Sequence, residues 1–457
     1  KSAKAYRAGE PIMHRALAAI MCVVVAGAMV TTPLSSATAQ TTIYKYEKKG
    51  GKSVKRLEGQ KKGTTRDKKK DSGATRSSSA PSRAAPAAAP TRGGATVDRP
   101  PPAERFEPGE VVVSNAPKGF ARSVRGLGFS VLERVSLKEL SVEIFRLRIP
   151  RASSVGQALK LLKRQFPGLE IDANHQFDLS AGSRIPESYV RAAIGWKTPA
   201  KCRAKVRIGM IDSALDMSHP ALKGRNIAYK SFHDPKRKPG QPDHGTAIAA
   251  MIIGKPGKKG WGGLIEGAKL FAANMFEINE NGKSVGNAMG LIKSINWMAK
   301  QKVHAVNVSV AGANNKVVRL AFMRAQRKGL LVIAAAGNWG KGAEPAYPAA
   351  YKDVVAVTAV GSRMRIYRKA NRGKYIDFAA PGVKIWTAVP GGGRVQSGTS
   401  FAVPYITTMM ALEVARGSGK KAGTLRKVLR KRAVDLGKPG RDKVFGWGYV
   451  KRKPKCA

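Results

Sequence analysis

The apolar residues divide the chain into an N-terminal apolar run, a polar low-complexity stretch and a long region of short apolar segments. Within residues 106–178, strand-like and helix-like spacing follow each other in the order strand, helix, strand, strand, helix, strand. The segments concerned are 110–113, 119–127, 129–135, 142–149, 155–165 and 169–173. This order predicts a small α+β domain with a ferredoxin-like arrangement.

A second and larger pattern begins after residue 202. Short runs rich in Val, Ile and Ala alternate there with longer segments of helical spacing. Strands are expected at 206–211, 270–275, 305–310, 330–336 and 354–360, and helices at 287–300 and 317–328. Such alternation is typical of an α/β domain whose helices cover both faces of a mostly parallel sheet. Functional groups of these sheets collect beyond the carboxyl ends of the strands.

The N-terminal apolar run has the features of an export signal. Basic residues precede the run at 16–30, and Ala37-Thr38-Ala39 follows it as a small-residue cleavage site. The run is shorter than the roughly 20 residues that a membrane-spanning helix needs. We therefore expect a signal peptide at 1–39 and a periplasmic or extracellular protein. Residues 40–105 are basic and rich in Pro, Ala and Ser, which predicts a disordered linker.

The charge of the chain is strongly positive. Lys and Arg number 83 against 29 Asp and Glu, so the formal net charge is +54. A field of this sign favours anionic partners. Because no sequence pattern of a nucleic-acid-binding module accompanies the charge, we expect non-specific attraction to anionic surfaces and no specific nucleic acid. Residues 451–457 are interpreted as a basic tail.

Three cysteines occur in the chain. Cys22 lies inside the apolar run and would leave with the signal peptide. An exported protein permits a disulfide between the two that remain, Cys202 and Cys456. Two free thiols are the alternative, and the sequence leaves both open because it does not set the geometry of the pair.

Three polar residues stand in motifs that suit nucleophilic catalysis. Asp212 directly follows a predicted buried strand, His244 is followed by Gly-Thr and a run of small helix-forming residues, and Ser400 precedes a predicted helix. A serine hydroxyl attacks a carbonyl at neutral pH only when a base accepts its proton and a third group orients that base. Asp, His and Ser are the residue types that meet this requirement.

These motifs, with Ala334-Ala335-Ala336-Gly337-Asn338 between the second and third, resemble those of the subtilisin-like serine endopeptidases, the subtilases or peptidase S8 family. The resemblance covers residues 186–450 and implies a three-layer subtilisin-like α/β fold. It implies a secreted enzyme that hydrolyses protein or peptide substrates through an acyl-enzyme. The implied catalytic residues are Asp212, His244 and Ser400, the oxyanion hole is Asn338 with Ser400, and the substrate strand is Ser309, Val310, Ala311 and Gly312.

The same resemblance implies a role for the domain at 106–178. It would be an inhibitor-type propeptide whose end lies along the substrate groove and which the enzyme removes by cleavage near 178–184. The chain would then be a self-processed zymogen with its own propeptide as a partner. A plain accessory domain is the alternative. The sequence does not indicate an oligomeric state.

Five positions depart from the family pattern. Alanine replaces glycine at three of them, and at the other two a phenylalanine stands in place of methionine and a tyrosine in place of histidine: Ala214, Ala250, Ala311, Phe401 and Tyr405. These changes leave the catalytic groups in place, so they bear on substrate range and rate. We expect no cofactor and see no clear cluster of calcium ligands, although sites built from backbone carbonyls remain open. An inactive subtilase-fold protein and a polycationic surface-binding protein are the alternative functions.

Overall fold

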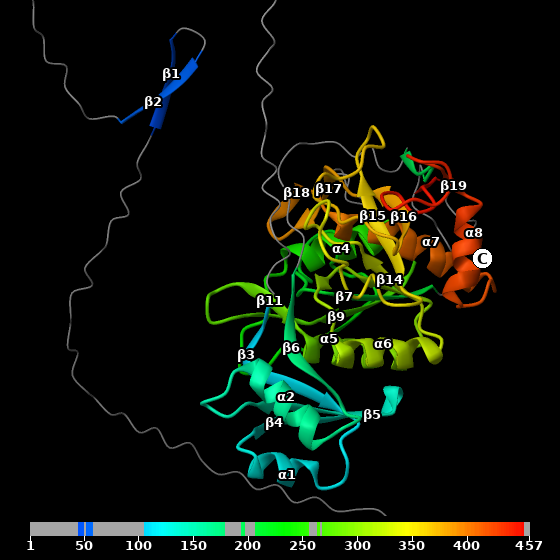
Figure 1. The fold of residues 1–457 in the computed structure, drawn as a ribbon. Helices are drawn as coiled ribbons and strands as arrows, with labels where there is room; N and C mark the ends of the chain where they lie inside the picture. Colours follow the sequence, from blue (N-terminus) through cyan, green and yellow to red (C-terminus); the bar gives the residue numbers. More distant parts are fainter. Residues whose placement is uncertain are drawn as a thin grey trace, which may run out of the picture. The chain divides into compact units, whose positions relative to one another are not determined.

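The computed structural model describes residues 105–178, 193–196, 206–255, 263–265 and 267–451, and the backbone of 44–49 and 52–57 (Figure 1). The chain separates into two compact units, Lys1–Arg92 and Gly93–Ala457. The expected signal peptide, most of the expected linker, the cysteines and nearly all of the basic tail lie outside the described residues.

The first unit contains an antiparallel hairpin of β1 (Tyr44–Lys49) and β2 (Lys52–Leu57). This hairpin falls inside the range 40–105, where the sequence predicts a disordered linker, and so differs from that expectation. In sequence the two strands are separated by Gly50-Gly51, a dipeptide that favours two-residue hairpin turns.

The second unit starts with a four-stranded antiparallel sheet in the order β6-β3-β5-β4. Its elements confirm the predicted order strand, helix, strand, strand, helix, strand. They are β3 (Phe106–Ser114), α1 (Phe120–Gly126), β4 (Ser130–Leu137), the 3₁₀ turn η1 (Lys138–Leu140), β5 (Val142–Arg148), α2 (Val155–Gln165) and β6 (Glu170–Asp178). The last strand extends well beyond the expected 169–173, because its second half pairs with strands outside this domain.

Both faces of this small sheet are buried. In β3, Val111 and Val113 pack in a core with α1 and α2, whereas Val112 packs in a different core on the opposite face. This alternation explains the continuous apolar run in the sequence. Helix α2 begins with a capping box in which the Ser154 hydroxyl accepts from the Gln157 backbone N–H and the Gln157 side chain accepts in return.

The larger domain is built on a nine-stranded sheet in the order β19-β20-β16-β15-β14-β12-β7-β9-β8. Neighbouring strands are parallel except for β19 and β20, which confirms the predicted sheet. The strands are β7 (Arg207–Asp212), β8 (Ile227–Ser231), β9 (Lys269–Asn274), β12 (Ala305–Val308), β14 (Val332–Ala335), β15 (Val355–Val360), β16 (Ile376–Pro381), β19 (Ala433–Val434) and β20 (Tyr449–Val450).

Helices cover both faces of this sheet (Figure 1). One core includes the inner residues of α5 (Ala288–Lys300) and α6 (Lys316–Arg327), and a second includes those of α4 (Asp243–Ile253), α7 (Val403–Ala415) and α8 (Ala422–Arg430). A hairpin of β17 (Ile385–Val389) and β18 (Gly392–Gln396) packs against α4. In the described part of the chain, no helix is long and apolar enough to cross a membrane.

The small sheet lies on the helices α5 and α6 of the larger domain. Val112 and Ile144 share a core with Ile292 of α5 and Phe322 of α6. The end of β6 also pairs antiparallel with β11 (Ser284–Asn287), which itself pairs with β10 (Phe276–Ile278), and with β13 (Ala311–Gly312). The two domains are therefore joined by a shared apolar core and by a continuous sheet.

Candidate active site

Asp212 and His244 form a buried hydrogen-bonded pair. Asp212 is the last residue of β7, and His244 lies in the first turn of α4. The Nδ1 atom of His244 lies 2.7 Å from Oδ1 of Asp212. The exposed fraction is 0% for the aspartate and 7% for the histidine, so little water weakens this contact. The structure thus brings together two residues that the sequence separates by 32 positions.

The backbone around this pair is held by Ser213, whose role the sequence did not reveal, and by Gly245, which the sequence predicts to allow close packing at the start of this helix. The Ser213 backbone N–H donates to Asp212 Oδ1 at 2.7 Å, and the Ser213 hydroxyl accepts from the Gly245 N–H at 2.9 Å. A Cβ atom on Gly245 would lie 2.5 Å from the Ala214 carbonyl oxygen. Only glycine lets α4 approach β7 closely enough for the Asp212–His244 contact.

Ser400 lies in a one-turn 3₁₀ helix, η2 (Thr399–Phe401), just before α7. The sequence predicts it at the start of the longer helix, but Ala402 precedes the first residue of α7, and the Ala402 N–H donates to the Thr399 carbonyl. The Ser400 hydroxyl donates to the Ser309 carbonyl at 3.0 Å. The buried Nε2 of His244 has no hydrogen-bond partner among the described residues. The ring of Phe401, the residue after Ser400, has its centroid 5.2 Å from that of His244, so the turn that carries Ser400 lies beside the imidazole.

Asn338 follows β14 and lies beside the serine turn. Its Oδ1 accepts from the Thr399 backbone N–H at 2.9 Å and from the Thr399 hydroxyl at 3.1 Å. Because both donors hold the oxygen, Nδ2 is the end of this amide that can donate to another group. The contact joins residues 61 positions apart. Thr399 belongs to the serine motif, but the motif alone does not show that this threonine orients Asn338.

The expected substrate strand contacts both the serine turn and β6. Ser309 and Val310 lie between β12 and β13, and the Ser309 hydroxyl donates to the Ser400 carbonyl at 3.3 Å. Ala311 and Gly312 form β13, which pairs with Asp178 and Phe177 of β6. The Phe177 ring lies over Gly312, where a Cβ atom would approach it to 2.5 Å.

Strand β11 pairs with the end of β6 on the side opposite β13, and the sequence analysis did not predict it. Gly286 pairs with Phe177, and Asn287 with Gln176. The end of β6 is therefore inserted between β11 and β13. Four residues of mixed character gave no periodic signal for β11, because its strand conformation depends on this pairing.

Charged side chains link the two domains next to this sheet. Arg237 Nη1 lies 2.7 Å from a Glu107 carboxylate oxygen of β3 and 2.8 Å from one of Glu277 in β10. The carboxylates of Glu107 and Glu277 are almost fully buried. Burial lowers the pKa of Arg237, but the hydrogen bonds and charges of these carboxylates outweigh it and raise the pKa above its ordinary value.

Arg146 of β5 forms a second link. Its Nη2 lies 3.0 Å from Asp234 Oδ2 of the larger domain, while Nη1 lies 3.3 Å from Glu110 Oε2 of its own domain. Burial tends to raise the pKa of Asp234, but a hydrogen bond from the Lys236 N–H and the Arg146 charge lower it overall. Lys293 of α5 also pairs with Glu133 of β4.

The departures from the family pattern leave these contacts in place. Ala214 and Ala250 are buried beside or within α4, and Ala311 still pairs in β13. Phe401 contacts the imidazole ring, and Tyr405 is buried in α7. Within the ranges that the structure describes, no three His, Cys, Asp or Glu side chains gather as a metal site.

Comparison with known proteins bears on the family and the fold of this chain. Residues 203–448, more than half of the chain, match the family model described as the subtilase family. The minor extracellular protease Epr of Bacillus subtilis is 34% identical over 212 residues, covering 46% of this chain but only 32% of Epr. The major intracellular serine protease of the same organism is 31% identical over 246 residues, covering 50% of this chain and 75% of that protein.

A solved structure shows a similar fold. Fervidolysin from Fervidobacterium pennivorans, described as a keratinolytic enzyme related to subtilisin, superposes with a TM-score of 0.63. The match covers 76% of this chain and 60% of fervidolysin at 21% sequence identity. At that identity the similarity concerns the fold, which is the subtilisin-like α/β arrangement expected from the motifs.

Proposed function

This chain belongs to the subtilase family, and from that premise we propose that it is a serine endopeptidase that acts through Asp212, His244 and Ser400. The observation that carries the proposal is the buried 2.7 Å contact between Asp212 and His244, together with Ser400 in the adjacent turn. A buried, hydrogen-bonded Asp–His pair is a requirement of catalysis, so its presence argues against an inactive protein with this fold.

The proposed reaction uses side chains of this chain alone. The Ser400 hydroxyl turns from the Ser309 carbonyl to His244 Nε2, which accepts its proton as the oxygen attacks the substrate carbonyl. Asp212 accepts from Nδ1 and stabilises the imidazolium that forms. His244 then donates the proton to the leaving amine. Water next attacks the acyl-enzyme while His244 accepts its proton, and His244 returns that proton to the Ser400 oxygen as the ester bond breaks.

The negative charge on the attacked carbonyl oxygen needs donors that are already in place. We assign this role to Nδ2 of Asn338 and to the backbone N–H of Ser400. The Thr399 contacts fix Asn338 before substrate binds, so its reorientation does not add to the barrier. A substrate strand between β11 and β13 would bring its carbonyl to this point, as the pairing of β6 indicates.

Replacing Asn338 by Ala tests the oxyanion assignment. We expect kcat to fall by about a hundred- to a thousand-fold with little change in KM, the range measured for the corresponding asparagine of subtilisin. The measurement is steady-state hydrolysis of a chromogenic peptide by the processed enzyme.

A second variant separates the donor role from a structural one. Asn338→Asp retains the oxygen that accepts from Thr399 but has no amide donor. If Asn338 only anchored Thr399, the Asp variant would recover most of the activity. We expect it to be at least as impaired as the Ala variant, because a carboxylate also repels the oxyanion.

We further propose that residues 106–178 are an inhibitor-type propeptide of an exported zymogen. The support is threefold: β6 occupies the groove between β11 and β13, the small sheet shares a core with α5 and α6, and buried ion pairs join the domains. Epr is named an extracellular protease, which agrees with export. The expected self-cleavage segment, 178–184, begins at Asp178, the last residue of β6, and its other residues lie outside the described part of the chain.

Arg237→Ala tests whether the ion pairs hold this domain in the groove. Removing the arginine, which is partly exposed, leaves the buried carboxylates of Glu107 and Glu277 without their charge partner and should weaken domain docking by about 2 kcal/mol. In the Ser400→Ala full chain, hydrogen exchange at the amides of β6 and β13 should become roughly thirtyfold faster.

The matched control is Arg134→Ala. Arg134 pairs with Glu143 inside the small domain and is largely exposed, so its loss should leave exchange at β13 unchanged. Equal acceleration in both variants, or none in Arg237→Ala, would show that these ion pairs do not hold β6 in the groove.

A further inference from the structure

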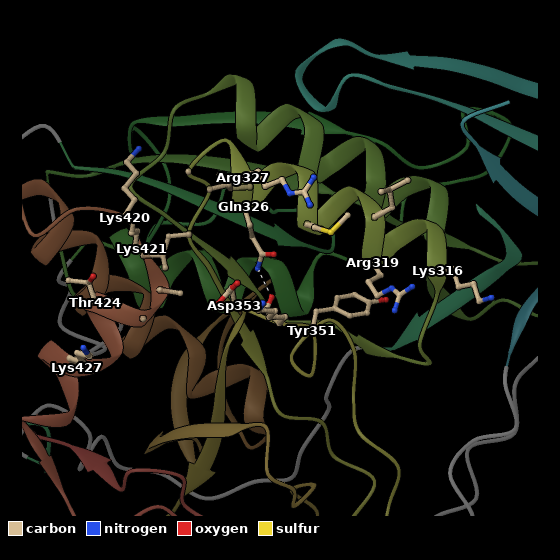
Figure 2. A pocket seen from close by; sticks show the side chains of 18 of the residues that line it. Lys316, Arg319, Gln326, Arg327, Tyr351, Asp353, Lys420, Lys421, Thr424 and Lys427 are labelled. Atoms are coloured by element: carbon tan, nitrogen blue, oxygen red, sulfur yellow. Dashed lines mark hydrogen bonds between the residues drawn. The ribbon is translucent and has the colours of Figure 1, made fainter. Parts of the chain in front are cut away.

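A basic groove lies between α6 and the start of α8, away from the active site. The groove encloses a cavity of about 880 Å³. Figure 2 shows side chains from both helices around it. The lining includes Leu330 and Leu331, which come just before β14, and Lys352 and Asp353, which come just before β15. The groove is thus at the amino ends of these parallel strands.

The active site lies at the opposite edge of the same sheet. Asp212 ends β7 at its carboxyl end, and Asn338 follows the carboxyl end of β14. Because β7, β12, β14 and β15 are parallel, the length of the strands separates the groove from both residues. A ligand in the groove would leave the substrate strands β11 and β13 uncovered.

The charge of the groove is one-sided. Seven basic residues line it, against the acidic Glu170 and Asp353. Six of the basic residues are exposed, and none of the six forms an ion pair with a residue in the described part of the chain: Lys316, Arg319, Arg327, Lys352, Lys421 and Lys427. Elsewhere in this domain, arginines such as Arg426 and Arg432 pair with buried carboxylates. The six cations are therefore available to a ligand.

The seventh basic residue has a structural role. The Lys420 ammonium group donates to the Val303 carbonyl at 3.0 Å. Burial, and then the nearby charge of Arg207, lowers the pKa of Lys420. We therefore leave it out of the ligand-binding set.

The rest of the lining indicates the kind of anion. Single-stranded nucleic acids stack their bases on accessible aromatic rings. Tyr351, the aromatic residue of this lining, is buried, and its hydroxyl donates to the Asn315 carbonyl at 3.0 Å. Leu320 and Met323 supply apolar surface between the cations. The groove thus places several guanidinium and ammonium groups one after another. This arrangement matches a flexible polymer that bears repeated oxyanions.

We propose that this groove binds a linear polyanion through consecutive phosphate or sulfate groups, and so holds the protein on an anionic polymer while the active-site cleft stays open. Arginine donates two parallel hydrogen bonds to such groups, and lysine contributes a mobile point charge. The excess of positive charge in the chain would speed the approach, while the groove determines where the polymer is held.

The test is calorimetric titration of the Ser400→Ala full chain with inorganic tripolyphosphate and with a heparin oligosaccharide, at about 0.15 M salt to screen surface charge. We expect saturable binding at one site. Arg319→Glu, Arg327→Glu and Lys421→Glu together should raise Kd by about tenfold or more.

The matched control reverses three exposed cations outside the groove: Lys223→Glu, Arg363→Glu and Lys438→Glu. It changes the net charge equally, so it should alter Kd by less than about twofold if the groove is the site. Thermal unfolding verifies that both triple variants are folded. Saturable binding that only the groove variant weakens supports the proposal. Which of the two ligands binds in this way shows whether the groove takes phosphate or sulfate groups. No saturable binding of either ligand, or equal weakening in both triple variants, would overturn it.

Discussion

Replacing Ser400 by Ala should lower peptide hydrolysis by about a million-fold, the size of loss measured for the corresponding serine of subtilisin. The variant keeps the buried Asp212–His244 pair but has no atom that can form the acyl-enzyme. The small residual rate would come from binding and oxyanion stabilisation alone. Hydrolysis of a chromogenic peptide measures the loss, and the same variant should accumulate as an unprocessed precursor in an intact-mass spectrum.

A buried serine close in sequence provides the control. The Ser397 hydroxyl accepts from the Lys384 backbone N–H at 2.9 Å, so it serves a different loop from the one that carries Asn338. Ser397→Ala should retain hydrolysis within a few-fold and should be processed normally. If Ser400→Ala hydrolysed peptide and matured as the unmodified chain does, the nucleophile would have to be another residue.

Replacing Asp212 by Asn should lower kcat by about ten-thousand-fold near neutral pH. The amide can still accept hydrogen bonds from the Ser213 N–H and His244 Nδ1, so the geometry should survive. Its neutral oxygen cannot stabilise the imidazolium, however, and its NH₂ group would be buried where Asp212 Oδ2 has no partner among the described residues. The measurement is the pH profile of kcat for the processed enzyme.

Asp377 is a suitable control for this second prediction. It is also a buried aspartate on a strand of the same sheet, but its carboxylate pairs with Arg426 and Arg441. Asp377→Asn should lower the melting temperature and leave kcat within a few-fold. Equal losses of kcat in both variants would indicate that burial of a polar group, and not catalysis, explains the effect of Asp212→Asn.

The sequence predicted the central strands and missed the peripheral ones for a physical reason. Strands such as β7 and β14 are buried on both faces, so their sequences are continuous apolar runs that are easily recognised as strands. Strand β8 is half-exposed, and β16 carries Asp377 and ends at Pro381. The two-residue strand β13 and the short β11 depend on pairing with β6, a contact between distant segments that local spacing does not encode.

The candidate site shows the same limit. The motifs indicated Asp212, His244, Ser400 and Asn338, and the structure joins Asp212 to His244 and Asn338 to the turn that carries Ser400. The motifs did not predict the direction of the Ser400 hydroxyl, which donates to Ser309, or the Thr399 contact that fixes Asn338. Both depend on packing between segments that lie at least 61 positions apart.

The most direct measurement of the central claim is covalent labelling of the processed protein with a fluorophosphonate, followed by peptide mass spectrometry. Ser400 is fully buried while β6 occupies the groove, so labelling requires material from which residues 106–178 have been released. The account predicts one adduct, on Ser400, that is absent from Ser400→Ala and forms far more slowly in Asp212→Asn. Folded, processed protein that carries no adduct on Ser400 would contradict it.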